Sequence, residues 1–93
     1  MTLRVIWTNS FKKDYKTAIK RGYDIKKLDD VIILLANNKS LPQNMRDHSL
    51  SGDFSGFREC HIQPDWLLIY TKDSENLILT LVKTGTHSDL FNK

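Results

Sequence analysis

Three histidines, one arginine and one aspartate are the side chains of this sequence whose types and spacing could do acid–base chemistry. They are His48, Arg58, His61, Asp65 and His87. Such a set can cleave RNA without a metal: a base takes the proton of the ribose 2′-OH, an acid protonates the leaving 5′-oxygen, and a cation offsets the charge developing on the phosphate. Histidine suits both proton transfers because its pKa lies near neutral pH. Arginine suits the phosphate through its forked donors.

The same residues leave two other interpretations open. Three histidines and a carboxylate could ligate zinc, but the histidine spacings of 13 and 26 residues match no helical H-x-x-x-H pattern, so we predict no metal site. The histidines could also be surface or capping residues without a catalytic role. Cys60, the one cysteine, has no base beside it in the sequence and is interpreted as a small strand residue and not as a nucleophile.

The composition is typical of one small globular domain. The chain has 93 residues, of which 40% are hydrophobic and 27% charged. A single cysteine excludes an internal disulfide and Cys-x-x-Cys metal sites. The longest apolar run, residues 31–36, is far too short to span a membrane, and the first residues lack the apolar segment of a signal peptide. We therefore expect a cytoplasmic protein with no membrane partner.

The charge is unevenly divided along the chain. Residues 1–46 carry ten Lys or Arg against four Asp or Glu, whereas residues 47–93 carry four against seven. The net charge of +3 therefore sums a basic first half and an acidic second half that holds all three histidines. A basic half indicates an anionic partner such as nucleic acid, although solvated helix faces are also rich in lysine.

Two amphipathic helices are predicted in the basic half, after a short apolar strand at residues 3–7. Thr8-Asn9-Ser10 offers N-caps for the first helix, Gly22 is suited to ending it, and Asp24 can cap the second. A short turn joins the helices into a hairpin with a basic outer face. Each helix carries one apolar stripe, formed by Phe11, Tyr15, Ala18 and Ile19 in the first and by Leu28, Val31, Ile32 and Leu35 in the second.

A long loop and three strands follow the helices. Residues 39–56 form a polar, Gly- and Pro-containing connection around His48, and compact domains seldom keep so long a loop without a function. The strand-like runs are residues 57–62, 66–70 and 77–82, of which the last two are mostly apolar. The order β-α-α-β-β-β predicts an α+β domain whose first strand joins the sheet.

Strand alternation limits which of the candidate residues can share a site. Successive side chains point to opposite faces of a sheet, so if Phe57 faces the helices, His61 points with it and Arg58 points away. Arg58 and His61 can then serve one site only if a bulge or the end of the strand near Gln63-Pro64 intervenes.

Residues 47–52, 56–70 and 84–91 resemble the YafQ branch of the RelE/ParE toxin superfamily. The resemblance rests on the R-x-x-H-I-x-P-D-W-L-L-I-Y run combined with T-G-T-H-x-x-L-F near the end of the chain. Length and helical hairpin also fit, so residues 1–93 would form a single toxin domain. The resemblance implies a RelE-like fold in which the helical hairpin packs on a small, largely antiparallel four-stranded sheet.

The resemblance also implies a function. Members of this branch are toxins of type II toxin–antitoxin systems: ribosome-dependent, metal-independent endoribonucleases that cleave mRNA in the ribosomal A site and so inhibit translation. The implied partners are a cognate antitoxin, mRNA and the ribosome with its 16S ribosomal RNA, while operator DNA is bound only through the antitoxin complex. No cofactor is implied. The alternatives are an RNA-binding module and a non-enzymatic ParE-like toxin of the same fold, although ParE-type gyrase inhibitors lack this set of histidines.

The resemblance assigns roles to residues of this sequence. His48 and His61 would be catalytic or orient the phosphate. Asp65 would assist proton transfer, and His87 would be the general acid. Arg58 would stabilise the phosphate, and Trp66 and Phe91 would shape the site or contact substrate, although Trp66 by itself is more typical of a core residue. The lysines implied to dock on ribosomal RNA are Lys12, Lys13, Lys16 and Lys20.

Two positions depart from the pattern of this branch. The loop motif usually reads D-H-P-L-x-G, and Ser49 stands in place of the proline, which frees the backbone beside His48 without removing a functional group. Glu59 stands where the branch often has aspartate. Its extra methylene changes the reach of any carboxylate that acts at this position.

Overall fold

The strands of the protein form one twisted sheet, seen in a computed structural model that describes residues 2–91. The strand order is β1-β5-β4-β3-β2; β1 pairs with β5 in parallel, and the other neighbours are antiparallel. The predicted α+β arrangement with a three-strand meander is confirmed. The strands are β1 (Arg4–Trp7), β2 (His48–Ser49), β3 (Arg58–Gln63), β4 (Trp66–Asp73) and β5 (Ile78–Gly85).

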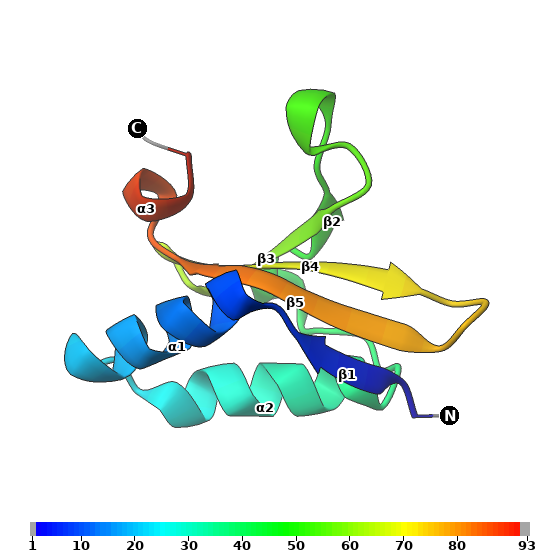
Figure 1. The fold of residues 1–93 in the computed structure, drawn as a ribbon, viewed down its shortest axis with the longest axis horizontal. Helices are drawn as coiled ribbons and strands as arrows, with labels where there is room; N and C mark the ends of the chain where they lie inside the picture. Colours follow the sequence, from blue (N-terminus) through cyan, green and yellow to red (C-terminus); the bar gives the residue numbers. More distant parts are fainter. Residues whose placement is uncertain (1, 92–93) are drawn as a thin grey trace.

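The helices divide the molecule into two sides. α1 (Asn9–Lys20) and α2 (Ile25–Ala36) form the predicted hairpin and cover one face of the sheet. α3 (His87–Phe91) and the segment that holds β2 rise from the opposite face (Figure 1). Among the described residues, no helix has the length and apolar character needed to cross a membrane.

Local chemistry sets the ends of the two long helices. Thr8 is the N-cap of α1, and its Oγ1 accepts a hydrogen bond from the backbone N of Phe11 at 3.1 Å. Gly22 follows the helix at φ +79°, a left-handed conformation that glycine adopts without a Cβ penalty. Asp24 stands at the N-cap position of α2, but its side chain makes no capping hydrogen bond.

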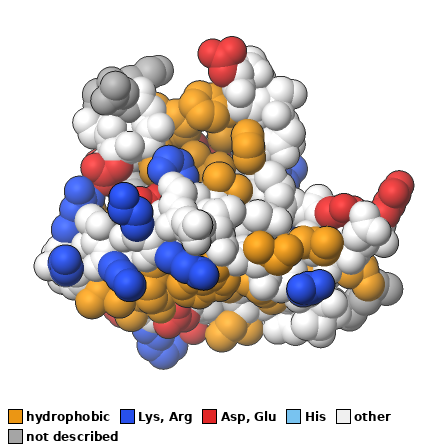
Figure 2. Space-filling view, in the orientation of Figure 1, with side chains coloured by type: hydrophobic (Ala, Val, Ile, Leu, Met, Phe, Trp, Pro, Cys, Tyr) orange, Lys and Arg blue, Asp and Glu red, His pale blue; other side chains and the backbone are white. Residues whose placement is uncertain are grey.

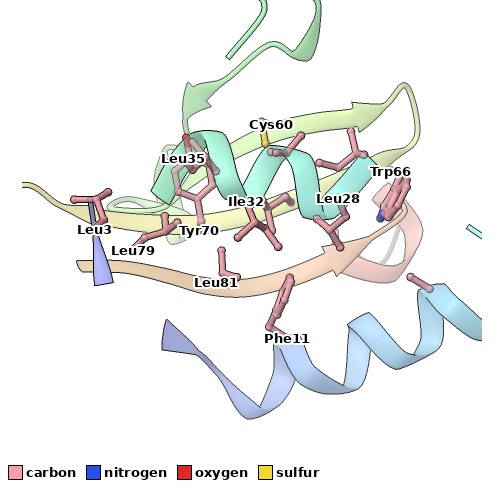
Figure 3. Close-up of a cluster of buried hydrophobic side chains, with 14 residues drawn as sticks. Leu3, Phe11, Leu28, Ile32, Leu35, Cys60, Trp66, Tyr70, Leu79 and Leu81 are labelled. Carbon is pink, nitrogen blue, oxygen red and sulfur yellow. The ribbon is translucent and has the colours of Figure 1, made fainter. Parts of the chain in front are cut away.

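The core lies between the helical hairpin and the sheet (Figure 3). Leu28, Ile32 and Leu35 form the buried stripe of α2 and Phe11 belongs to that of α1, as the spacing predicts. Burial of this apolar surface is the main favourable contribution to folding. The sheet side chains in this cluster are Cys60, Ile62, Trp66, Leu68, Tyr70, Leu79 and Leu81.

The sheet has one strand more than the four expected from the sequence. β2 has only two residues, and His48 and Ser49 pair with Glu59 and Arg58 of β3. A strand of two residues is too short to show an alternating sequence pattern. These residues are extended because they pair with the free edge of β3. The predicted loop of residues 39–56 is thereby divided, with the 3₁₀ turn η1 (Gln43–Met45) before β2 and the 3₁₀ turn η2 (Gly52–Phe54) after it.

Candidate active site

The histidines lie on the face of the sheet opposite the helical hairpin. On β3, Cys60 and Ile62 belong to the core under the helices, so Glu59 and His61 point to the other face. β2 pairs His48 with Glu59 and so adds His48 to the same face. His61 therefore does not face the helices, so the arrangement considered from the sequence, in which Phe57 and His61 both face them, does not occur.

The three imidazole rings form a row with one buried carboxylate. The ring centroids of His48 and His61 are 6.4 Å apart, and those of His61 and His87 are 5.8 Å apart. Oε1 of Glu59 lies 3.4 Å from Nε2 of His61 and 3.6 Å from Nε2 of His48. Because Glu59 is only 5% exposed, its carboxylate depends on these imidazoles for compensation.

Backbone carbonyls orient two of the rings. Nδ1 of His48 lies 2.6 Å from the carbonyl O of Arg46, and Nδ1 of His61 lies 3.3 Å from that of Pro64. A carbonyl oxygen only accepts hydrogen bonds, so Nδ1 carries the donated proton in both rings. Nε2 of each ring then faces Glu59 and is the nitrogen that can exchange a proton.

A second carboxylate orients His87. Oδ1 of Asp65 accepts hydrogen bonds from Nδ1 of His87 at 2.6 Å and from its backbone N at 3.0 Å. The backbone bond, followed by the ring bond, holds the pKa of Asp65 below its ordinary value. The ionised carboxylate fixes the Nδ1–H tautomer and stabilises a cationic ring, which leaves Nε2 of His87 free for proton transfer.

α3 is held in place by hydrogen bonds within its first turn and by Arg21, the residue that follows α1. Thr86 and Asp89 form a capping box, in which Oγ1 of Thr86 accepts from N of Asp89 and Oδ2 of Asp89 accepts from N of Thr86. Nη1 of Arg21 reaches the same Oδ2 at 2.6 Å. Arg21 first, and then Thr86, hold the pKa of Asp89 well below its ordinary range. A Cβ at position 85 would lie 2.9 Å from Oδ2 of Asp89, so the close approach of the Asp89 side chain to the backbone of Gly85 favours glycine there.

Trp66 supports the site from within the core. It is 2% exposed, and its Nε1 donates to Oγ1 of Thr84 at 3.0 Å. The core interpretation is therefore confirmed, and of the two implied roles a buried ring is better suited to shaping the site than to contacting substrate. Trp66 anchors the start of β4 beside the turn that carries Asp65. A pocket of about 800 Å³ opens next to that turn, and its walls include His61, Asp65 and the cations Lys27 and Arg46.

Arg58 does not join the histidines. It pairs across the strands with Tyr70, whose ring lies in the helix-side core, so it points away from His61, as strict alternation predicts. Its Nη1 donates to Oγ of Ser49 at 2.8 Å, and its Nε lies 3.4 Å from Oδ1 of Asp47. The register shift after His61 comes too late in β3 to turn Arg58 over. Arg58 thus contacts the β2 segment on the face opposite His61, and its phosphate contact stays a prediction.

The remaining predicted positions lie at the border of the site or on the other side of the molecule. Phe91, at the end of α3, is half-buried and contacts Phe54 with ring centroids 5.2 Å apart. Lysine and arginine side chains gather over α1 (Figure 2). The four lysines predicted to dock on RNA are all exposed there, namely Lys12, Lys13, Lys16 and Lys20.

Sequence reasoning assigned no secure role to two residues of this region, Glu59 and Phe54. Glu59 was singled out only as a departure from a family pattern, yet it lies two residues before His61 on the same strand. Side chains two residues apart on a strand point to the same face of the sheet, so the sequence already indicated that Glu59 and His61 share a face. Phe54 had no such signal, because only the tertiary structure brings η2 against α3.

Glu59, His61 and His87 also have the chemistry of a metal site. Each offers one ligand atom, and the three atoms lie within 4.8 Å of one another. Two imidazoles and a carboxylate suit zinc, copper and similar ions. The residues that could carry protons could thus also hold a cation.

Comparison with known proteins decides the family. A family model described as "Bacterial toxin of type II toxin-antitoxin system, YafQ" matches residues 3–92. The chain belongs to the YafQ toxin family. The resemblance seen in the sequence is thereby confirmed, and the chain is placed among the mRNA interferase toxins of type II toxin–antitoxin systems.

Three similar proteins agree with this family assignment in sequence or in structure. The "mRNA interferase toxin YafQ" of Escherichia coli K12 is 41% identical over 86 residues, which is 91% of each chain. The YafQ chain in the E. coli DinJ-YafQ toxin–antitoxin complex is 38% identical with a TM-score of 0.89, over 98% of this chain and 99% of that one. A copper-bound mutant toxin from Helicobacter pylori is 37% identical with a TM-score of 0.89, over 96% of this chain and 99% of that one.

Proposed function

We propose that this YafQ-family chain is a ribosome-dependent, metal-independent endoribonuclease that cleaves mRNA in the A site and so stops translation in the cytoplasm. The observation that carries the proposal is an oriented acid, His87, beside a candidate base formed by the buried carboxylate of Glu59 and the imidazoles that face it. Asp65 holds His87 with its Nε2 free, while Glu59 lies against Nε2 of both His48 and His61. Cleavage needs one group to take a proton and another to supply one.

The proton that leaves the ribose is taken at the Glu59 cluster. The base, Glu59 or an imidazole beside it, removes the proton of the 2′-OH, and the 2′-oxygen then bonds to phosphorus. Glu59 suits this role by position, because its Oε1 lies 3.4 Å from Nε2 of His61 and 3.6 Å from Nε2 of His48, the ring nitrogens that can pass a proton. An imidazole of this row that carries a proton would offset the charge of the developing phosphorane.

His87 supplies the second proton. As the bond from phosphorus to the 5′-oxygen breaks, Nε2 of His87 protonates the leaving oxygen, which gives a 5′-OH and a 2′,3′-cyclic phosphate. The Asp65 carboxylate stabilises the cationic ring that precedes this step. Each proton transfer contributes typically about 10²- to 10⁴-fold to the rate.

The two sides of the molecule fit a position between mRNA and the ribosome. The histidine face would meet the mRNA, and the lysines of α1, on the opposite side of the sheet, would contact 16S ribosomal RNA through its phosphates. A cognate antitoxin would hold the toxin inactive, and operator DNA would be bound only through that complex. The DinJ-YafQ complex of the E. coli relative supports the antitoxin as a partner.

The test is to map the 5′ ends of mRNA on programmed ribosomes. Wild type should give codon-phased cuts with and without a chelator selective for zinc and copper that leaves the Mg²⁺ of the ribosome in place, and it should leave the same free RNA uncut, whereas His87→Gln should give none. A lysine-to-glutamate variant at Lys12 and Lys16 should retain the cutting position but bind ribosomes more weakly and with less salt dependence. Intact mRNA combined with inhibited gyrase would instead favour the ParE-like alternative.

A further inference from the structure

Phe54 is an exposed aromatic side chain that the acid–base chemistry does not use. It ends η2, between the strand that carries His48 and the strand that carries His61, and 40% of its surface is exposed. Residues 51–56 around it are all exposed as well. The ring is therefore accessible to a ligand at the edge of the histidine face.

The partner of Phe54 in the fold is Phe91. The two rings meet edge-to-face, with centroids 5.2 Å apart and an interplanar angle of 89°. Phe91 ends the short helix that begins at His87, so the contact joins the two segments that rise from the site face (Figure 1). Hydrophobic side chains gather in the hollow between these segments (Figure 2).

The turn that presents Phe54 is closed by local hydrogen bonds. The backbone N of Phe54 donates to the carbonyl O of Ser51, and that of Ser55 donates to Gly52. Gly52 and Gly56, on either side of the ring, have φ values of +63° and +95°, which glycine adopts at no steric cost. The ring contact with Phe91 therefore ties a small turn, hinged at two glycines, to the helix of the proposed acid.

We propose that Phe54 and Phe91 form an aromatic platform that binds one nucleobase of the mRNA beside the scissile phosphate. The platform rests on the proposed function and adds a substrate contact to it. Aromatic side chains stack on unpaired bases of any identity, because every base has a π-face. The platform therefore provides affinity and position, and it does not select the codon.

The platform also explains how the reacting atoms are aligned. Cleavage requires the 2′-oxygen, the phosphorus and the 5′-oxygen to lie nearly in line, which a strand with continuously stacked bases does not present. A base held on a protein ring leaves the stack of its neighbours and lets the backbone rotate at the adjacent phosphate. Alignment of reacting groups in this way contributes strongly to rate, so loss of the ring should lower kcat as well as raise KM.

The direct test uses ribosomes programmed with an mRNA that carries 2-aminopurine in the A-site codon and a 2′-deoxy sugar that blocks cleavage. Wild type should quench the 2-aminopurine fluorescence by stacking, and Phe54→Leu should quench it less. With cleavable mRNA, Phe54→Leu should lower kcat/KM by about 5- to 150-fold, the range expected for one stacked base. Phe54→Tyr keeps the ring and should remain close to wild type in both measurements.

Two controls separate stacking from folding. Ile33→Ala removes a side chain that is 56% exposed on α2 and should leave quenching and cleavage unchanged. The Tm of Phe54→Leu should fall by less than about 10 °C, because only one ring contact at the surface is lost, so the variant stays folded at the assay temperature. The platform would be overturned if Phe54→Leu quenched the 2-aminopurine fluorescence as strongly as wild type does. It would also be overturned if Phe54→Tyr lost as much quenching and cleavage as Phe54→Leu.

The outcomes for the platform and for the proposed function are distinguishable. If wild type cuts mRNA and Phe54→Leu cuts equally well, the platform is wrong and the nuclease stands. If wild type fails to cut but quenches 2-aminopurine in a manner that depends on Phe54, the proposed cleavage is wrong and the base-binding platform stands.

Discussion

His87 donates two hydrogen bonds, from its ring Nδ1 and from its backbone N, to the same carboxylate oxygen of Asp65. The two residues are 22 positions apart in the chain, on the turn after β3 and at the start of α3. The contact therefore fixes both the tautomer of the proposed acid and the place of the helix that carries it.

Replacement of Asp65 by asparagine tests this relationship with little change in shape. The amide keeps an acceptor for the ring but removes the charge that stabilises the cationic imidazole, so cleavage of ribosome-bound mRNA should fall by about 10²- to 10⁴-fold. Initial rates on programmed ribosomes measure the effect. Asp53→Asn, at an exposed position on η2, is the matched control and should cleave normally. Full activity of Asp65→Asn would contradict the assigned role.

Acid should weaken the attachment of α3. The pKa values of Asp65 and Asp89 are both lowered in the folded protein, so these groups bind fewer protons folded than unfolded. Their contribution to stability is fully present above the unfolded pKa of about 4 and is lost as pH falls through the folded values. The free energy of unfolding by urea should therefore decline between about pH 4 and pH 2.

The control for this acid response is the double variant Asp65→Asn/Asp89→Asn. It lacks both titrating groups, so its free energy of unfolding should change less steeply with pH over the same interval, whatever its absolute stability. An equal slope in wild type and the double variant would show that other carboxylates cause the decline.

Tyr70 should act through the segment that carries His48. Its buried hydroxyl donates to Oδ1 of Asp47 at 2.5 Å, the residue before His48, and burial together with this bond raises the pKa of Tyr70, which keeps the donor protonated. Tyr70→Phe should lower the free energy of unfolding by about 1–2 kcal/mol. It should also reduce cleavage on the order of tenfold, because His48 loses its fixed position.

The matched control for Tyr70 lies in the helical hairpin. The hydroxyl of Tyr15 donates to Oδ1 of Asp29 at 2.7 Å, away from the histidines. Tyr15→Phe should therefore cost similar stability in urea unfolding but leave the rate of mRNA cleavage unchanged. If both variants lose cleavage equally, the effect of Tyr70 is one of stability alone.

Copper or zinc should inhibit the toxin. An ion bound by Glu59, His61 and His87 would occupy the lone pairs through which these groups exchange protons, so added Cu²⁺ should lower the cleavage rate and EDTA should restore it. Isothermal titration should show weaker binding to Glu59→Gln, while Glu75→Gln on the β4–β5 turn should bind like wild type. Stimulation of cleavage by the metal would contradict a metal-independent reaction.

The helices and their core face could be predicted from residue spacing alone. Leu28, Ile32 and Leu35 follow the helical period and lie in the core, because one stripe of an isolated helix has to be covered whatever the partner. The histidines could be selected as candidates by type, but their placement on one face required the pairing of β2 with β3 and the contact of His87 with Asp65. The roles assigned to them stay predictions until cleavage is measured.

The amino-acid sequence was sufficient for the helical hairpin, the strands other than β2, the family motifs and the set of groups able to carry protons, since these depend on residue type and on short-range periodicity. Only the tertiary structure revealed strand β2, the contacts of the Arg58 side chain with Asp47 and Ser49, and the contact between the rings of Phe54 and Phe91. Each of these depends on contacts between segments that are far apart or irregular in the chain. Such contacts follow from which edges and faces the packed sheet leaves free, and no local pattern encodes them.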